Sequence, residues 1–219
     1  MAIANFPLGM NARNFLYVRK YNPTGAKKIA DNKLLTKRIL IKEDIAITEI
    51  LKTFANRGAI RSFDWKLPKE GFAVKPARGY GGEGIIVFTS WNGIYGTTLS
   101  GETINAGQLE SHLFDIFEGE YSLQNLPDKA YIEERINPNK FFRKLTSIGL
   151  PDIRVILFNK IPVMAMLRLP TRESGGTANM HRGALAVAVD IRTGITKNAY
   201  GRGKFYDRIP GTSVKARGI

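Results

Sequence analysis

The sequence is short of several residue types, and each shortage excludes a class of structure. Its 219 residues include no cysteine, which excludes disulfides and thiolate zinc sites and fits a cytoplasmic protein. The two histidines, His112 and His181, lack the spacing of a metal-binding pair, and we predict no metal ligand in this chain. No window offers the apolar run of a membrane span, and residues 1–20 lack the charged and apolar segments of a secretory signal.

Negative charge is also scarce. The chain has 19 Asp and Glu against 33 Lys and Arg, so its formal net charge is +14. Such a chain favours phosphates, nucleic acids, anionic membrane surfaces or acidic substrates, although a merely solubilising basic surface is an open alternative. The basic residues are dispersed, so we expect no basic tail. At 43% hydrophobic residues, the chain has enough apolar surface to fold as a globular protein.

The hydrophobic pattern predicts short helices mixed with strands joined mostly by hairpins. Apolar residues near helical spacing predict one helix from about 24 to 42, and INAGQLESHLFDIFEG predicts a second, amphipathic helix. We predict a hairpin over 151–170 that turns at Asn159-Lys160. Further strands are predicted at EGFAVKP, IIVF, GIYGTTL, AYIEERI and ALAVAVDIRTG. Strict alternation of strand and helix is absent, which favours an α+β fold over a doubly wound parallel sheet.

The segment GYGGEG, residues 79–84, matches a glycine pattern that several nucleotide sites share. A dinucleotide-binding site needs a helix after the last glycine, but IIVF follows Gly84 and reads as a strand. A P-loop needs Lys-Ser/Thr at that point. A flap between two strands remains, in which backbone N–H groups can lie over phosphates. Lys75 precedes this flap, whereas in protein kinases the lysine follows it.

A lysine before a glycine flap resembles the ATP-grasp superfamily, and the resemblance covers about residues 10–185. Asp31-Asn32-Lys33-Leu34 looks like the helix start that carries the family's first ATP lysine, and Lys75 looks like the second. YIEERI, 131–136, resembles the hinge strand that pairs with adenine, and PDIRVILF, 151–158, resembles the strand after it. MLRLP and ANMHRGA resemble most closely the branch of glutathione synthetase and the RimK-type glutamate ligases, in particular alpha-L-glutamate ligase-like proteins.

The resemblance implies a role for individual residues. ATP would be bound by Lys33, Lys75, Gly79, Gly81, Gly82, Gly84, Glu133, Glu134, Ile136 and Asp152. Glu133, Glu134 and Ile136 would contact adenine along an exposed strand edge, and Asp152 would hold the ribose. The reacting anions would be handled by Arg154, Arg168, Asn179 and Arg182. A solvated basic surface is the alternative for the cations, and a surface charge pair for Glu133.

The resemblance also implies an architecture of two α+β lobes with ATP between them. We predict a helical segment at 1–30, an N-terminal lobe at 31–130 and a C-terminal lobe at 131–219. Mg²⁺ is expected with ATP, on carboxylates and an asparagine of late strands. After Gly183 the only carboxylates are Asp190 and Asp207, so we expect the C-terminal lobe to be incomplete and the metal ligands to lie outside this chain.

The chemistry implied is ligation of a carboxylate to an amine through an acyl-phosphate, with an amino acid or an acidic peptide or protein as acceptor. Catalysis would rest on positioning and charge neutralisation rather than on a side-chain nucleophile. One alternative is an ATP-binding module that no longer ligates and acts with a partner. A basic nucleic-acid binder is a second alternative, but we predict no nucleic-acid partner because ordered motifs outweigh bulk charge.

Overall fold

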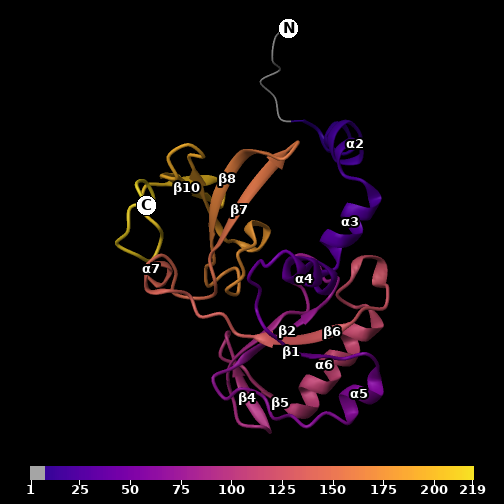
Figure 1. Ribbon diagram of the computed structural model, residues 1–219. Helices are drawn as coiled ribbons and strands as arrows, with labels where there is room; N and C mark the ends of the chain where they lie inside the picture. Colours follow the sequence, from indigo (N-terminus) through magenta and orange to yellow (C-terminus); the bar gives the residue numbers. More distant parts are fainter. Residues whose placement is uncertain (1–7) are drawn as a thin grey trace. The chain divides into compact units, whose positions relative to one another are not determined.

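The computed structural model describes residues 8–219 and has the α+β class that the sequence predicts (Figure 1). By its internal contacts the chain divides into a unit that ends at Ile47 and a second unit, Thr48–Ile219, and each is described by itself. The predicted lobe boundaries at 30 and 130 stay predictions. Among residues 8–219, no helix has both the length and the apolar character that crossing a membrane requires.

The first unit is helical. Its helical segments are α1 Met10–Ala12, the π-helix η1 Arg13–Val18, α2 Arg19–Tyr21, α3 Thr24–Asp31 and α4 Lys33–Lys42. The prediction of a single helix from 24 to 42 is wrong, because Asn32 leaves the helical conformation, with φ −110° and ψ 100°. Its side chain instead accepts a hydrogen bond from the Leu35 N–H at 3.0 Å. Asn32 therefore caps a new helix that begins at Lys33.

Two antiparallel sheets form the second unit. The first contains β1 Ile50–Thr53, β2 Phe72–Pro76, β3 Ile86–Trp91, β4 Tyr95–Thr98, β5 Thr103–Asn105 and β6 Ala130–Glu134. Their order is β1-β6-β2-β3-β4-β5, so consecutive hairpins connect β2 to β5. The second contains β7 Asp152–Phe158, β8 Ile161–Leu169, β9 Leu185–Val189, β10 Thr196–Gly201 and β11 Lys204–Tyr206, in the order β11-β10-β9-β8-β7.

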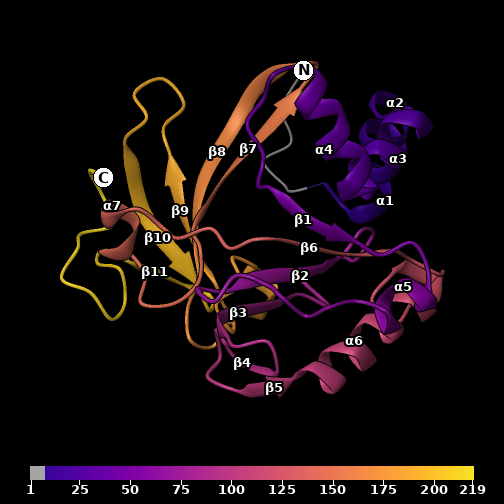
Figure 2. The same cartoon turned by 60° about the horizontal axis from the view of Figure 1, so that its bottom comes forward.

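Two helices, α5 Arg57–Arg61 and α6 Ala106–Glu118, cover one face of the first sheet (Figure 2). The predicted amphipathic helix is confirmed, because Leu109, Leu113 and Ile116 of α6 are fully buried against the sheet. A capping box between Asn105 and Gln108 begins this helix, and a left-handed Gly119 ends it. One face of the sheet is thereby committed to packing, which leaves the opposite face of β2 and β6 for polar side chains.

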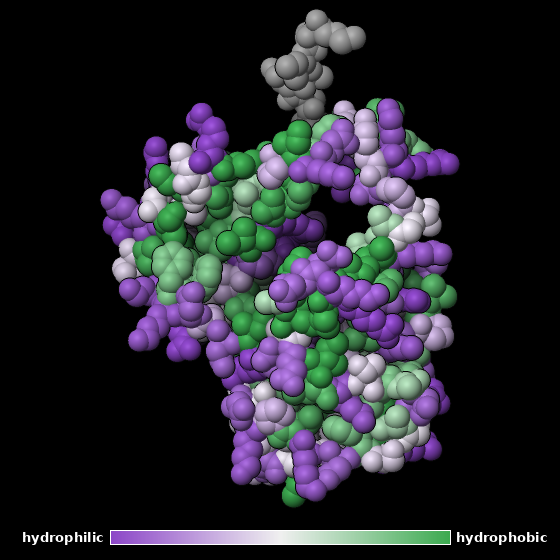
Figure 3. Space-filling view, viewed as in Figure 1, coloured by the Kyte–Doolittle hydropathy of each residue, from purple (hydrophilic) through white to green (hydrophobic). Residues whose placement is uncertain are grey.

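The predicted hairpin of the second sheet is confirmed, with its turn at Asn159 and Lys160. Both residues have positive φ, 48° and 66°, which matches the twist of paired strands. A second core lies under this sheet and includes Leu167, Leu185 and Val187. Exposed apolar residues of the hairpin gather on the face shown in Figure 3. Three short helical turns complete the unit: η2 Leu123–Asn125, α7 Lys140–Arg143 and η3 Met180–Arg182.

Candidate nucleotide site

Two residues predicted to bind ATP lie together on the polar face of the first sheet. Val74 and Ile132 belong to the apolar core, so their neighbours Lys75 and Glu133 point to the opposite face. There the Lys75 ammonium and the Glu133 carboxylate form an ion pair. Glu133 is only 2% exposed and also accepts a hydrogen bond from the Thr48 hydroxyl at 2.8 Å. Glu133 is therefore a buried partner of the predicted phosphate lysine, not a surface charge.

Strand β6, which carries the predicted adenine-binding residues, is not an edge strand. It pairs with β1 on one side and with β2 on the other. The Glu134 N–H already donates to the Glu49 carbonyl at 3.0 Å. Ile136 lies beyond the end of the strand and is 48% exposed. Strand β6 is thus interior to the sheet as far as Glu134, so the edge offered to adenine can begin only at the Glu134 carbonyl, and the roles of Glu134 and Ile136 stay predictions.

The glycine segment 79–84 forms a loop between β2 and β3, as predicted, and both ends of this flap are anchored. At its start, the Arg78 N–H donates to the Asp128 carboxylate at 2.7 Å. At its end, His112 Nε2 lies 2.9 Å from the Gly84 carbonyl. Because a carbonyl can only accept, Nε2 carries the proton, and Nδ1 can accept from the Tyr121 hydroxyl at 3.4 Å. Burial lowers the pKa of His112, which favours this neutral form.

The glycines of the flap have two different reasons to be glycine. At Gly84, φ is +69° and a Cβ would lie 2.5 Å from the Tyr121 ring, so a side chain is excluded by packing. Gly81 and Gly82 also have positive φ, but a Cβ there would meet nothing closer than 3.6 Å. The tip of the flap is therefore open around its backbone, as a cover for phosphates requires.

The tip of the flap contacts two residues that were predicted to handle anions. The Asn179 side-chain amide donates to the Gly81 carbonyl at 2.9 Å. Arg182 forms an ion pair with Glu83, the one charged residue of the flap. Both contacts come from the segment around η3, which follows β8. Residues separated by about a hundred positions in the sequence are thereby brought together at one loop.

Asp152 and Arg168 lie opposite each other on β7 and β8 and form a two-point ion pair. Arg168 Nε donates to one carboxylate oxygen of Asp152 at 2.7 Å, and Nη2 contacts the other. Arg154 lies two residues on from Asp152 on the same strand face, as predicted, and is exposed. The two contacts between Arg168 and Asp152 have the bidentate guanidinium–carboxylate geometry that arginine favours.

Lys33, the remaining predicted lysine, is the first residue of α4 in the first unit. The resemblance placed Lys33 at a helix start, and the Asn32 cap confirms that local structure. Its predicted role in ATP binding stays a prediction.

Three predicted cations, Lys75, Arg168 and Arg182, each pair with a carboxylate. The charges of these cations are therefore balanced by carboxylates of the protein itself. A bound phosphate or carboxylate would compete with those carboxylates for the cations. Sequence reasoning missed Glu83, Asp128 and His112, which hold the flap. A glutamate inside a glycine run was the only visible signal among them.

The described residues do not fit a magnesium site. Within 8–219 no three acidic or histidine side chains lie close enough to hold a metal ion. Asp190 lies in a turn, where it accepts from the Thr193 and Arg192 N–H groups and pairs with Lys197 at 3.5 Å. These hydrogen bonds, first that from Thr193, lower the pKa of Asp190. Mg²⁺ that binds with ATP needs only one or two protein carboxylates beside phosphate oxygens and waters, but Glu83, Glu133 and Asp152 are each already paired with a cation.

Comparisons with known proteins agree with this geometry at the level of the superfamily. No curated protein and no solved structure matches the chain. One family model does match, over residues 12–219, and it is described as sugar-transfer associated ATP-grasp. The ATP-grasp resemblance is thus confirmed, whereas the comparison does not support the glutamate-ligase branch in particular. ATP-grasp domains generally bind ATP with Mg²⁺ and are generally ATP-dependent ligases. The chain belongs to the family of sugar-transfer associated ATP-grasp proteins.

Proposed function

We propose that this chain binds ATP beneath the flap and uses it to activate a carboxylate for attack by an amine. The observation that carries the proposal is the placement of Lys75. It lies near the end of β2, the strand that leads into an anchored glycine flap, and the tip of that flap contacts Asn179 and Arg182. A lysine and backbone N–H groups beside a flap are suited to holding phosphate oxygens.

The proposed reaction needs no side-chain nucleophile. A carboxylate oxygen of the substrate attacks the terminal phosphorus of ATP, the bond to ADP breaks, and an acyl-phosphate forms. The amine then attacks the acyl carbon, phosphate leaves, and the nitrogen loses a proton. Lys75 and the flap would position the phosphates, while Arg168, Arg182 and Arg154 would neutralise charge on the reacting anions.

The net charge of the chain indicates the chemical class of the substrates. The net charge of +14 favours an acidic acceptor, and the resemblance to glutamate ligases supports an amino acid or acidic peptide in that role. The sugar-transfer association belongs to the family description. It supports testing sugar-linked carboxylates and amines beside glutamate.

The test is calorimetric titration of ATP, with and without Mg²⁺, into the wild type, Lys75→Ala and Lys75→Gln. We expect both variants to lose about tenfold or more in affinity, because the lysine charge contacts phosphate. Lys75→Gln retains a donor for Glu133 and keeps the test valid if Lys75→Ala fails to fold. Lys66→Ala is the control, since within residues 8–219 the ion-pair partner of Lys66 is the exposed Asp64 alone.

Equal affinity in Lys75→Gln and wild type would refute the proposed site. ATP binding without ADP release, tested with mixtures of carboxylates and amines, would instead favour the ATP-binding module that does not ligate.

A further inference from the structure

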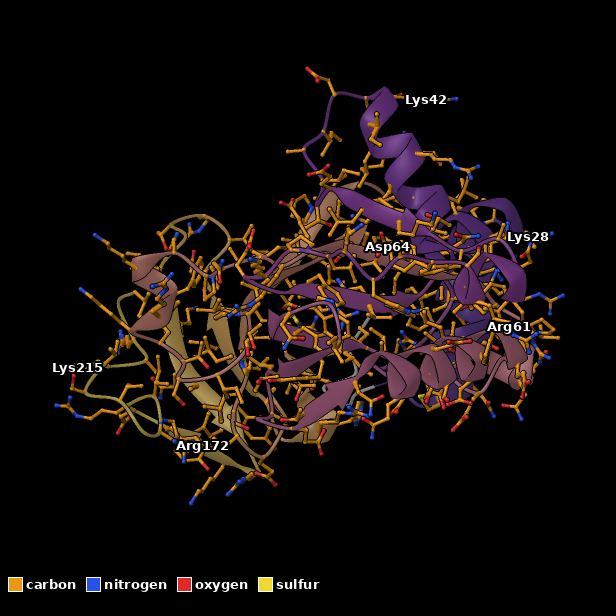
Figure 4. All side chains as sticks on the ribbon, turned by 90° about the horizontal axis from the view of Figure 1, so that it is seen from below. Lys28, Lys42, Arg61, Asp64, Arg172 and Lys215 are labelled. Carbon is orange, nitrogen blue, oxygen red and sulfur yellow. The ribbon has the colours of Figure 1, made fainter. Side chains whose placement is uncertain are left out.

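A second concave site lies in the second sheet, near the end of the chain. Its cavity of about 330 Å³ is lined by Asn198, Asp207, Arg208, Lys215 and Arg217. Asn198 comes from β10, and the others come from the loop that follows β11. Figure 4 shows Lys215 on the outer side of this loop. Strand β9 separates β10 from β8, which carries Arg168, so this cavity is not part of the nucleotide site.

The loop that lines the cavity is held in place by the core. Ile209 and Ala216 are buried beneath the sheet, at 2% and 0% exposure. Backbone hydrogen bonds join Ile209 to Val214 at 2.9 Å and Ala216 to Asp207 at 2.8 Å. The cations on either side of these anchors are therefore held at fixed positions along the backbone.

Two of those cations face each other directly. Arg208 and Lys215 are partners in an antiparallel bridge, a position at which like charges repel. The Arg208 guanidinium is further fixed by a hydrogen bond to the Ser213 carbonyl at 2.7 Å. Among the described residues, no carboxylate oxygen lies within 4 Å of Arg208, Lys215 or Arg217. Even with Asp207 counted, the cavity has a formal charge of +2.

We propose that this cavity binds a phosphate ester that also carries hydroxyl groups, such as a sugar phosphate. Arg208, Lys215 and Arg217 all line the cavity, and a phosphate has enough oxygens to accept from all three. Asp207 would repel the phosphate but can accept hydrogen bonds from hydroxyls, and Asn198 can both donate and accept. The volume lies at the lower end of small-molecule sites and exceeds the need of a simple anion.

The test is calorimetry on the full chain with three probes: glucose 1-phosphate, inorganic phosphate and glucose. We expect glucose 1-phosphate to bind more tightly than phosphate, and glucose not to bind measurably. Lys215→Gln/Arg217→Gln should weaken both phosphate probes about tenfold or more, because two charge-assisted contacts are lost. Lys160→Gln/Arg192→Gln removes the same charge from exposed turns outside the cavity and should change affinity less than about twofold.

Asp207→Asn separates the two parts of the proposal. It should tighten binding of inorganic phosphate and reduce the preference for glucose 1-phosphate, because the amide oxygen is a weaker acceptor for hydroxyls than the carboxylate. No binding to the wild type, or an equal loss in the two double variants, would overturn the site. Equal affinity of the wild type for both phosphate probes would overturn the hydroxyl contacts. ATP titration of Lys215→Gln/Arg217→Gln should match wild type, so this site and the nucleotide site can fail separately.

Discussion

At the scale of single residues, the flap depends on what each side chain would meet. Gly84 lies against Tyr121, and its carbonyl accepts a hydrogen bond from His112. At Gly81 and Gly82 a Cβ would meet nothing closer than 3.6 Å, although the Gly81 carbonyl accepts a hydrogen bond from Asn179. The glycine pattern therefore combines two kinds of position. At Gly84 a side chain would clash with Tyr121, whereas at Gly81 and Gly82 glycine permits a positive φ.

We expect Gly84→Ala to destabilise the protein more than Gly93→Ala does. Both glycines have positive φ, +69° and +97°, but a Cβ at Gly93 meets nothing within 4 Å. Gly93→Ala should cost about 1–2 kcal/mol from backbone strain alone. Gly84→Ala should cost about 1–3 kcal/mol more from overpacking against Tyr121. Urea unfolding of both variants measures the difference, and equal costs would show that Tyr121 moves aside freely.

A second residue-scale prediction concerns pH. Burial lowers the pKa of His112 in the folded protein below its ordinary value of 6.5. The unfolded chain then binds more protons below that value, so the contribution is full above about pH 6.5 and is lost as pH falls through the folded pKa. His112→Gln should flatten the pH dependence of the unfolding free energy between pH 7.5 and 5.5. His181→Gln is the control, since His181 is exposed, and an unchanged slope in His112→Gln would contradict the prediction.

At the scale of elements, the flap is held at three places. Asp128 and His112 anchor its two ends, and the segment around η3 contacts its tip through Asn179 and Arg182. The contacts at the tip are partly exposed, since the Glu83 and Arg182 side chains are 43% and 38% exposed. The anchors at the two ends are more buried. Opening of the flap should therefore begin at the tip.

We expect Glu83→Gln to speed amide hydrogen exchange in residues 80–84 about twofold to fivefold, because a partly exposed ion pair is worth about 1 kcal/mol or less. Hydrogen exchange with mass spectrometry of the flap peptide measures this. The control is Glu118→Gln, which removes the exposed Arg57–Glu118 pair between α5 and α6. Equal exchange in Glu83→Gln and wild type would show that Asn179 alone holds the tip.

At the scale of the whole molecule, the charge of +14 would act on any polyanion. We expect weak binding to duplex DNA at 50 mM salt that falls steeply by 200 mM, since dispersed cations act by counterion release. ATP affinity should change far less over the same range, because fixed contacts are screened less than a diffuse surface. Fluorescence anisotropy with DNA and calorimetry with ATP test this. DNA binding that persists at 200 mM salt would revive the nucleic-acid alternative.

The sequence predicted the elements whose signals are local. Apolar spacing predicted the helix that is α6, and the Asn159-Lys160 pair predicted the β7–β8 turn, whose positive φ values the structure then shows. The glycine flap was predicted because the residues after Gly84 are β-branched and therefore favour a strand rather than a helix. By contrast, periodicity alone joined α3 and α4, because a single capping residue, Asn32, does not disturb the apolar pattern.

Tertiary structure decided what depends on pairing between distant strands. By itself, the sequence determined the α+β class, the flap and its lysine, because alternation, glycine and helix caps act within a few residues. It did not determine that β6 lies between β1 and β2, since the order of strands is set by contacts across the whole sheet. Nor did it determine that Lys75, Arg168 and Arg182 each have a carboxylate partner. The Lys75–Glu133 pair forms because folding removes the Glu133 carboxylate from water, whereas the two partly exposed pairs depend on which strands and loops the fold brings together.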